Sequence, residues 1–559
     1  MKKIKPWLAV WASMALLALA HFRDVRRGID ITGDGWLASW YTVLVFVIFL
    51  GAGAAGVLFL NLAGKRQWRL EQIYPLAGLF LGGLYLFVLP PLSAPDEVSH
   101  YISSYQLSSR LMGRQAVSRE GKVLVRGMDW FLEDTEGNYT FYKDEDNIWK
   151  VLGAQTEDQD WKALGYELRE KTYRMIHDIG FLGGEVPQKE MFEEKGEDIA
   201  GQTAASIHLI VVTTPVAYAP QALGISLARV LCLDSIWLAY MGRLFNLVFF
   251  VALTTLAMRR LPFGKEVLFG VALLPMTLNL SASFSYDVMI MGCLFYLTAV
   301  CIDLACAKEK AGWRDIAILM LLMAAAGPCK MIYGVMMGLC LLIPVKKFGG
   351  WKKWALSATA VAGAWAVAMI LVNSRVITNY VTEAEPVVEW AQEAGYSLSF
   401  LLRNPGKLIR IFYQTILWQA ETYHLTMIGS YLGNLDQGLD VPYLMVVFFT
   451  FCLMALSLRK PGESLLLTGG RRVWIFVVCA ACVAAAMGSM LLAWTPVSSK
   501  IINGVQGRYF LPFLPVFLMA CKNDWLILTK DRNRSILYLM FCANGYTLFR
   551  LFSVVCMRT

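Results

Sequence analysis

Charged residues are scarce in this chain. Asp, Glu, Lys and Arg make up 17% of its 559 residues, whereas hydrophobic residues make up 57%. A soluble domain of ordinary composition carries about a quarter charged residues. Apolar runs of about 20 residues, long enough to cross a bilayer, recur along nearly the whole sequence. The low charge therefore argues against a soluble protein and predicts an all-α polytopic membrane protein.

Further absences exclude other classes of protein. None of the twelve cysteines falls between residues 91 and 204, the longest polar stretch, so no disulfide framework is expected there. Cys479 and Cys482 form a C-x-x-C pair, but inside an apolar run they are better interpreted as small packing residues. No glycine-rich phosphate loop lies on a strand–helix unit, which disfavours a soluble nucleotide-sugar enzyme.

The distribution of charge predicts how the chain lies in the membrane. Residues 91–204 hold 22 of the 42 acidic residues and 13 basic ones, so they carry −9 and the remainder +18. Most of that positive charge lies in short loops, a pattern of membrane orientation and not of nucleic-acid binding. Lys2, Lys3 and Lys5 predict a cytoplasmic N-terminus followed by an uncleaved first helix. No eukaryotic targeting signal is evident, so a bacterial plasma membrane is expected.

Hydropathy predicts about 13 membrane crossings with the C-terminus outside. We expect an N-terminal hairpin over 1–70, a membrane core over 71–530 that includes an extracytoplasmic loop subdomain over 91–204, and a C-terminal helix over 531–559. Two segments, 206–228 and 404–436, are expected to be re-entrant or to lie on the outer surface, because crossings there would turn later basic loops outward. The predicted helices run over 7–22, 40–62 and 72–89 and then begin near Ile236, Glu266, Tyr286, Asp315, Met331, Trp354, Val441, Val473, Tyr509 and Ser535.

A cluster of polar residues follows the third predicted helix. If a new helix begins after Pro95, Asp96 and Glu97 lie three to four residues from His100 and share one side of its first turn. Such a group suits proton transfer or cation binding at the membrane surface. The structural alternative is a helix start, with Ser93 as N-cap and the acids favoured by the helix dipole.

Further polar residues are expected on the same face or within apolar helices. They are Arg243, Asp287, Lys330, Tyr333, Arg508 and Tyr509. Ionisable side chains at membrane depth cost several kcal/mol unless they meet a partner or a polar cavity. A carboxylate suits general-base work on a hydroxyl, and arginine and lysine suit a phosphate. Structural alternatives remain for each ionisable residue, since Arg508 can reach lipid headgroups and Asp287 can cap its helix. Arg243 can likewise pair with an acid, and Lys330 can mark a loop edge.

Six motifs in order along the chain identify a resemblance. They are Pro95-Asp96-Glu97-x-x-His100-Tyr101, Tyr218-x-Pro220-Gln221-Ala222-Leu223-Gly224, Gly242-Arg243-Leu244-x-Asn246, Ser285-Tyr286-Asp287, Lys330-x-x-Tyr333 and Gly504-Val505-Gln506-Gly507-Arg508-Tyr509. Over roughly residues 89–515 the chain resembles a bacterial membrane-protein family known as domain-of-unknown-function family 2142. That family in turn resembles the C-type membrane glycosyltransferases (GT-C), which have many helices and an acidic residue in the first outer loop of their core.

The resemblance implies a GT-C-like architecture and an integral-membrane glycosyltransferase. Such enzymes move a sugar from a polyprenyl-phosphate donor to a saccharide, lipid or protein acceptor outside the cytoplasm. Asp96 or Glu97 matches the acidic position, here after the third helix, so residues 1–70 would be an added hairpin. The implied roles are catalysis with inversion by Asp96, Glu97 and His100, and binding of the lipid phosphate or sugar by Arg243, Asp287, Lys330, Tyr333, Arg508 and Tyr509.

Cofactors and competing functions complete the expectations. No cofactor is expected to be required. Asp, Glu and His side chains could hold a divalent cation near Asp96, but three such residues on one helical turn are not a specific metal signature. The lipid bilayer is the expected surrounding partner. One alternative is a transporter or flippase of a lipid-linked saccharide, disfavoured by the lack of an internal repeat. Another is a non-catalytic partner in envelope-polysaccharide assembly, whose polar cluster would tolerate substitution.

Overall fold

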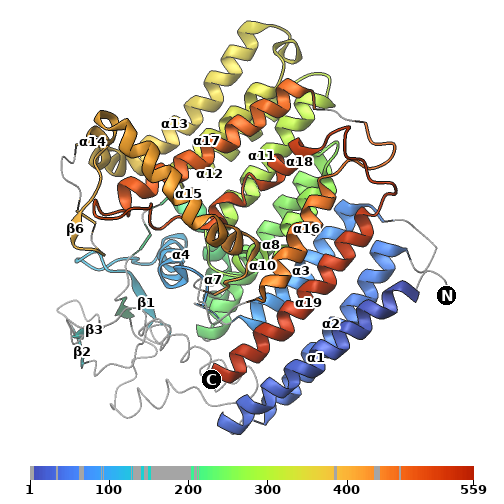
Figure 1. The fold of residues 1–559 in the computed structure, drawn as a ribbon. Coiled ribbons are helices and arrows are strands. Elements are labelled where there is room, and N and C mark those ends of the chain that lie inside the picture. The colour runs from blue at the N-terminus through green and yellow to red at the C-terminus, as the bar shows by residue number, and fades with distance from the viewer. Residues whose placement is uncertain are drawn as a thin grey trace.

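Helices form most of the described chain, as predicted (Figure 1). The computed structural model describes residues 5–32, 35–61, 68–89, 91, 93–126, 129, 140–143, 149–152, 203–206, 210–211, 213–233, 235–382, 387–388, 390–433, 441–464 and 467–558. Much of the predicted loop subdomain 91–204 therefore lies outside the described residues.

Helices occur along the whole described chain. The α-helices are α1 (Lys5–Thr32), α2 (Trp36–Leu60), α3 (Leu70–Val88), α4 (Glu97–Leu111), α7 (Ala219–Val230), α8 (Ser235–Arg260), α9 (Lys265–Ala272), α10 (Pro275–Ser281), α11 (Asp287–Cys306), α12 (Trp313–Ala326), α13 (Trp351–Thr382), α14 (Leu398–Arg403), α15 (Pro405–Ile428), α16 (Tyr443–Leu456), α17 (Gly469–Ala493), α18 (Leu514–Cys521) and α19 (Asn533–Arg558). The 3₁₀ helices are η2 (Pro215–Tyr218), η3 (Met331–Leu342), η4 (Val345–Phe348) and η5 (Gly507–Phe510).

Eight of the described helices are long and apolar enough to cross a membrane. They are α1, α2, α3, α8, α11, α13, α17 and α19. The polytopic membrane class is therefore confirmed, whereas the total of about 13 crossings and the GT-C-like architecture remain predictions. The two segments expected to avoid a full crossing contain α7 and α15, and neither helix belongs to the eight.

Some predicted membrane helices are interrupted, which corrects the expectation of continuous α-helices. The helix expected from Glu266 is split into α9 and α10, with Pro275 at the first position of α10. Proline cannot donate the hydrogen bond that would continue α9. The Val271 carbonyl, which a backbone N–H at position 275 would bond in a continuous helix, accepts a hydrogen bond from the Thr277 hydroxyl at 2.9 Å, so the break is satisfied inside the protein. The helix expected from Met331 is the 3₁₀ helix η3, and the one expected near Tyr509 consists of the short elements η5 and α18.

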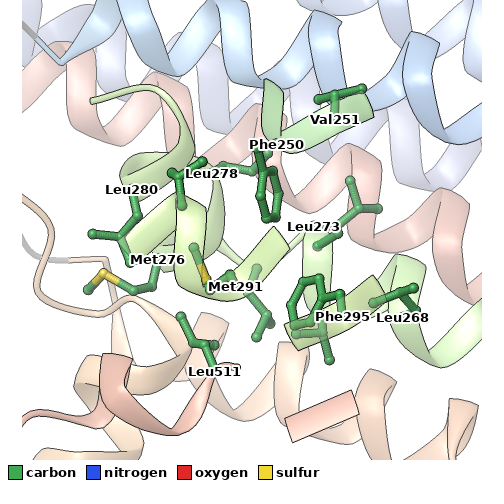
Figure 2. Close-up of a cluster of buried hydrophobic side chains, with 14 of the residues drawn as sticks. Phe250, Val251, Leu268, Leu273, Met276, Leu278, Leu280, Met291, Phe295 and Leu511 are labelled. Carbon is green, nitrogen blue, oxygen red and sulfur yellow. The ribbon is translucent and has the colours of Figure 1, made fainter. Parts of the chain in front are cut away.

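The centre of the molecule is built around α11. In its apolar stretch 89% of residues are buried, against 11% in α13 at the margin of the molecule. Figure 2 shows Met291 and Phe295 of α11 among Phe250 of α8, Leu268 of α9 and Leu511. Lipid is as apolar as these side chains, so close packing and not water exclusion is what they contribute. This packing holds the N-terminal end of α11, and with it Asp287, in a fixed place.

The predicted N-terminal hairpin and C-terminal helix pack on each other. Figure 1 shows α1, α2 and α19 side by side at one edge of the molecule. The Trp11 Nε1 group donates to the Tyr538 hydroxyl at 2.7 Å, and that hydroxyl donates to the Ala52 carbonyl at 3.0 Å. A buried tyrosine hydroxyl needs such partners, so Tyr538 ties both hairpin helices to α19.

A small sheet lies next to α4. The sheet has the order β1-β4-β3-β2, formed by β1 (Leu124–Arg126), β4 (Thr203–Ala205), β3 (Trp149–Leu152) and β2 (Thr140–Lys143). β1 and β4 are antiparallel, with Val125 opposite Ala204. Next to β1, the buried Asp129 accepts hydrogen bonds from the Tyr105 hydroxyl of α4 at 2.6 Å and from Arg126 Nε at 2.7 Å. This pairing anchors the described part of the loop 91–204 to α4.

Candidate functional site

Three charged side chains from distant parts of the chain meet at the N-terminal end of α11. Asp287 is the first residue of that helix, Lys330 directly precedes η3, and Arg508 lies in η5. Lys330 Nζ lies 2.8 Å from Asp287 Oδ1, and Arg508 Nη1 lies 3.2 Å from Asp287 Oδ2. All three side chains are largely buried. Two cations therefore share one buried carboxylate.

Asp96 supplies a second carboxylate to the same arginine. Arg508 Nη2 lies 3.1 Å from Asp96 Oδ2, and the Asp96 side chain is 65% exposed. Arg508 thus bridges a buried acid and an exposed one. The backbone of Asp96 is left-handed, with φ of 56°, a conformation that costs most residues about 1 to 2 kcal/mol and that aspartate tolerates better than most. Asp96 makes no capping hydrogen bond to α4, so its carboxylate is not used as a helix cap.

Aromatic side chains border the charged cluster. His100 Nδ1 and the Tyr218 hydroxyl are hydrogen-bonded at 2.7 Å, and the His100 ring meets the Tyr286 ring edge-on at 4.9 Å. Lys330 Nζ lies 4.2 Å from the centre of the Tyr509 ring and 5.2 Å from that of Tyr286, within cation–π range. Burial lowers the pKa of His100 to about 4, so the imidazole is neutral at neutral pH. The sequence analysis includes Tyr218 and Tyr286 in its motifs but assigns them no role in the site.

Glu97 and Arg243 pair with each other and not with the cluster. Arg243 Nε lies 3.3 Å from Glu97 Oε1, and both side chains are fully buried. Glu97 also accepts backbone hydrogen bonds from Phe284 at 2.8 Å and from Ala94 at 3.0 Å. Arg243 Nη1 donates to the Leu89 carbonyl at 2.9 Å. The pair thus fixes the start of α4 against α8 and the turn before α11. It thereby also holds the backbone of the neighbouring residue Asp96 in place.

The turn before α11 is held by two amide side chains that the sequence prediction also left without a role. Asn246 Nδ2 of α8 donates to the carbonyls of Ser283 at 2.7 Å and Ser285 at 3.1 Å. Gln221 Nε2 of α7 donates to the Phe284 carbonyl at 3.2 Å. The signal that could have identified them is an amide side chain within an apolar segment, where an unpaired polar group is costly.

The segment that carries Arg508 is closely packed against α15. A Cβ atom on Gly507 would lie 1.8 Å from the Tyr423 carbonyl oxygen of α15, so this position requires glycine. The Tyr333 hydroxyl donates to the Tyr509 carbonyl at 2.9 Å. Tyr333 therefore contacts the backbone of η5 and orients it, and the substrate contact expected from the sequence stays a prediction.

The described residues contain no group of three or more His, Cys, Asp and Glu side chains that could hold a metal ion. Of the three residues considered for a divalent cation near Asp96, Glu97 is directed into its own pair with Arg243. The cation remains a prediction, with at most Asp96 and His100 on this side.

Comparison with known proteins gives the family. No curated protein and no solved structure matches the chain significantly. A family described as "Predicted membrane protein (DUF2142)" matches residues 185–517. This range includes Arg243, Asp287, Lys330, Tyr333, Arg508 and Tyr509, whereas Asp96, Glu97 and His100 precede it. Because the match covers more than half of the chain and contains five of the six motifs from which the resemblance was inferred, the protein belongs to the DUF2142 family of predicted membrane proteins.

Proposed function

We propose that this protein is an integral-membrane glycosyltransferase that moves a sugar from a polyprenyl-phosphate donor to an acceptor hydroxyl, with inversion at the anomeric carbon. One observation carries the proposal: an exposed carboxylate, Asp96, lies 3.1 Å from a buried guanidinium that belongs to a cluster with two cations and one buried acid. A carboxylate open to an acceptor and cations able to receive a phosphate are the two groups that this reaction needs.

In the proposed mechanism Asp96 takes the proton of the acceptor hydroxyl as the oxygen attacks the anomeric carbon. The bond between that carbon and the phosphate oxygen breaks, and its electron pair leaves with the lipid phosphate. Arg508 and Lys330 stabilise the leaving phosphate, while Asp287 holds both cations in place. A positioned base contributes about 10²- to 10⁴-fold in rate. Tyr286 and Tyr509 line the site and would pack against the sugar ring.

The charge at the two ends of the bundle supports an extracytoplasmic site. The far end of α11 carries Asp303, which pairs with Arg260, and Lys308 follows in the next loop. Basic loops at that end belong in the cytoplasm by the positive-inside rule. Asp287, at the opposite end of the same helix, would then face the outer leaflet. The same reasoning assigns α4 and the small sheet to the outside and supports localisation in a bacterial plasma membrane.

The experiment compares wild type with Asp96→Asn in nanodiscs, using a panel of polyprenyl-phosphate sugars and acceptors. We expect Asp96→Asn to slow release of the lipid phosphate by at least about 100-fold with donor binding retained. The matched control is Asp524→Asn, because Asp524 is also 65% exposed and also pairs with an arginine, Arg459. Turnover by Asp96→Asn at the wild-type rate would exclude Asp96 as the base.

A flippase for the same lipid-linked saccharide is the second candidate. The observation that favours it is the break between α9 and α10 together with the unwound turn before α11, since broken helices at the substrate site are common in transporters. Donor binding without turnover, together with faster movement of a labelled donor between the leaflets of proteoliposomes, would support this function instead. If the protein shows neither turnover nor movement of the donor, a non-catalytic role in envelope-polysaccharide assembly is the remaining candidate.

A further inference from the structure

A cavity lies at the opposite end of the bundle from the charged cluster. It measures about 260 Å³ and is lined by residues of α12, η3, η4 and the first half of α13. Its walls are apolar and include Leu319 of α12, Leu341 of η3 and Val361 of α13. The one hydroxyl among the lining side chains, that of Ser357, already donates to the Lys353 carbonyl at 2.8 Å. The cavity therefore suits an apolar occupant and offers little to water.

The cavity is accessible from the bilayer. In Figure 1, α13 lies at the margin of the molecule, and it packs mainly on α12 and less on η4 and η3. Only 11% of its apolar stretch is buried. A hydrocarbon chain could enter sideways between these helices without crossing a polar surface.

Lysines lie next to the lining residues of the cavity in the sequence. Lys346 directly precedes Lys347 and the lining residue Phe348, and Lys352 and Lys353 directly precede the lining residue Trp354. Lys353 also lies one helical turn before Ser357, on the same face of α13. Lys346, Lys352 and Lys353 are exposed, and no ion pair found among the described residues includes them.

The buried acid at the start of α12 is paired with other cations. Asp315, in the first turn of α12, is bonded to Arg260 at 2.8 Å and to Lys308 at 2.7 Å. Two exposed tryptophans, Trp313 and Trp351, lie at the same end of the bundle. Tryptophan is enriched at the headgroup level of membranes. The lysines are therefore placed where a lipid phosphate would be.

We propose that this cavity binds one acyl chain of an anionic phospholipid, whose headgroup phosphate contacts Lys346, Lys352 and Lys353. Clusters of lysine and arginine beside membrane helices on the basic side recognise anionic lipids electrostatically. The cavity adds a fixed place for the chain, which an exposed basic patch alone does not provide. The site is separate from the proposed transferase site, and its test does not depend on turnover.

The test is native mass spectrometry of delipidated protein titrated with phosphatidylglycerol or phosphatidylcholine. Wild type should prefer phosphatidylglycerol. The triple variant Lys346→Gln/Lys352→Gln/Lys353→Gln should bind phosphatidylglycerol about 100-fold more weakly, at roughly fivefold per lysine, and the wild-type preference should fade at high salt. The variant Ala358→Leu/Ala362→Leu, which fills the cavity, should weaken both lipids.

The matched control removes three exposed charges at the other end of the protein, with Arg403→Gln/Arg410→Gln/Lys500→Gln. This control should bind phosphatidylglycerol as wild type does. Equal affinity of wild type for the two lipids, or an unchanged affinity in the lysine variant, would overturn the proposal. The lysine variant alters exposed side chains only, so the test stands even if the cavity-filling variant fails to fold.

Discussion

Asp96 and Asp287 contact the same guanidinium but should respond to mutation in opposite ways. Asp96→Asn should leave the stability of the protein nearly unchanged and abolish its activity. Asp287→Asn should destabilise the fold itself. The reason is the difference in exposure, since the Asp96 side chain is 65% exposed and that of Asp287 is 8% exposed.

The structure sets the size of each effect. Asp287 is the carboxylate that compensates both Lys330, at 2.8 Å, and Arg508, at 3.2 Å. Removing one partner of a buried ion pair typically costs about 3 to 5 kcal/mol, because the other charge stays buried without compensation. The Asp96 carboxylate is 65% exposed, so water can compensate for its loss and its ion pair contributes about 1 kcal/mol or less. Arg508 also keeps Asp287 and the Gln506 side chain as partners when Asp96 is changed.

The measurement is thermal unfolding of the detergent-solubilised protein, followed by intrinsic fluorescence at one scan rate. The midpoint of Asp287→Asn should fall clearly below wild type, while those of Asp96→Asn and the control Asp524→Asn should stay close to it. Equal midpoints for Asp96→Asn and Asp287→Asn would refute the reasoning, because they would mean that the two acids do not differ in burial or in partners.

Three further predictions concern single positions. Gly507→Ala should destabilise the protein by about 1 to 3 kcal/mol or more, because its Cβ would lie 1.8 Å from the Tyr423 carbonyl oxygen. The control Gly363→Ala, whose Cβ would have no neighbour within 4 Å, should be neutral in the same unfolding assay. Burial lowers the pKa of His100 from 6.5 to about 4, so the unfolded state binds the extra proton first. Stability should therefore fall as pH drops from about 6.5 towards 4, by up to about 3 kcal/mol, and His100→Gln should lose that part of the pH dependence. Asp96→Gly should be more stable than Asp96→Ala by about 1 kcal/mol, because glycine accepts the positive φ without strain; equal midpoints would contradict a left-handed residue here.

The sequence predicted most members of the charged cluster but not their arrangement. Asp96, Asp287, Lys330 and Arg508 were recognisable because ionisable residues in apolar surroundings need a partner or a function. Asp96 and Glu97 are neighbours of similar chemistry, so the sequence could not separate them. The left-handed backbone at Asp96 decides the matter, because the carboxylate of Asp96 stays exposed while Glu97 is directed inward to Arg243.

The sequence by itself determined the membrane class of this protein. The free energy of transferring a side chain into lipid depends mainly on its chemical type, so a run of apolar residues predicts a membrane helix wherever it lies in the fold. Pro275 and Gly507 are also recognisable in the sequence as residues that interrupt helices. The structural effect of each depends on the residues packed beside it.

Only the tertiary structure decided which helices meet and which charges pair. Asp96 and Arg508 are 412 positions apart, and no local pattern connects them. The same holds for Trp11 of α1 and Tyr538 of α19. Ion pairs and hydrogen bonds act over a few ångströms, so their partners are fixed by how the buried faces of helices such as α8 and α11 pack, and that packing is a property of the whole chain.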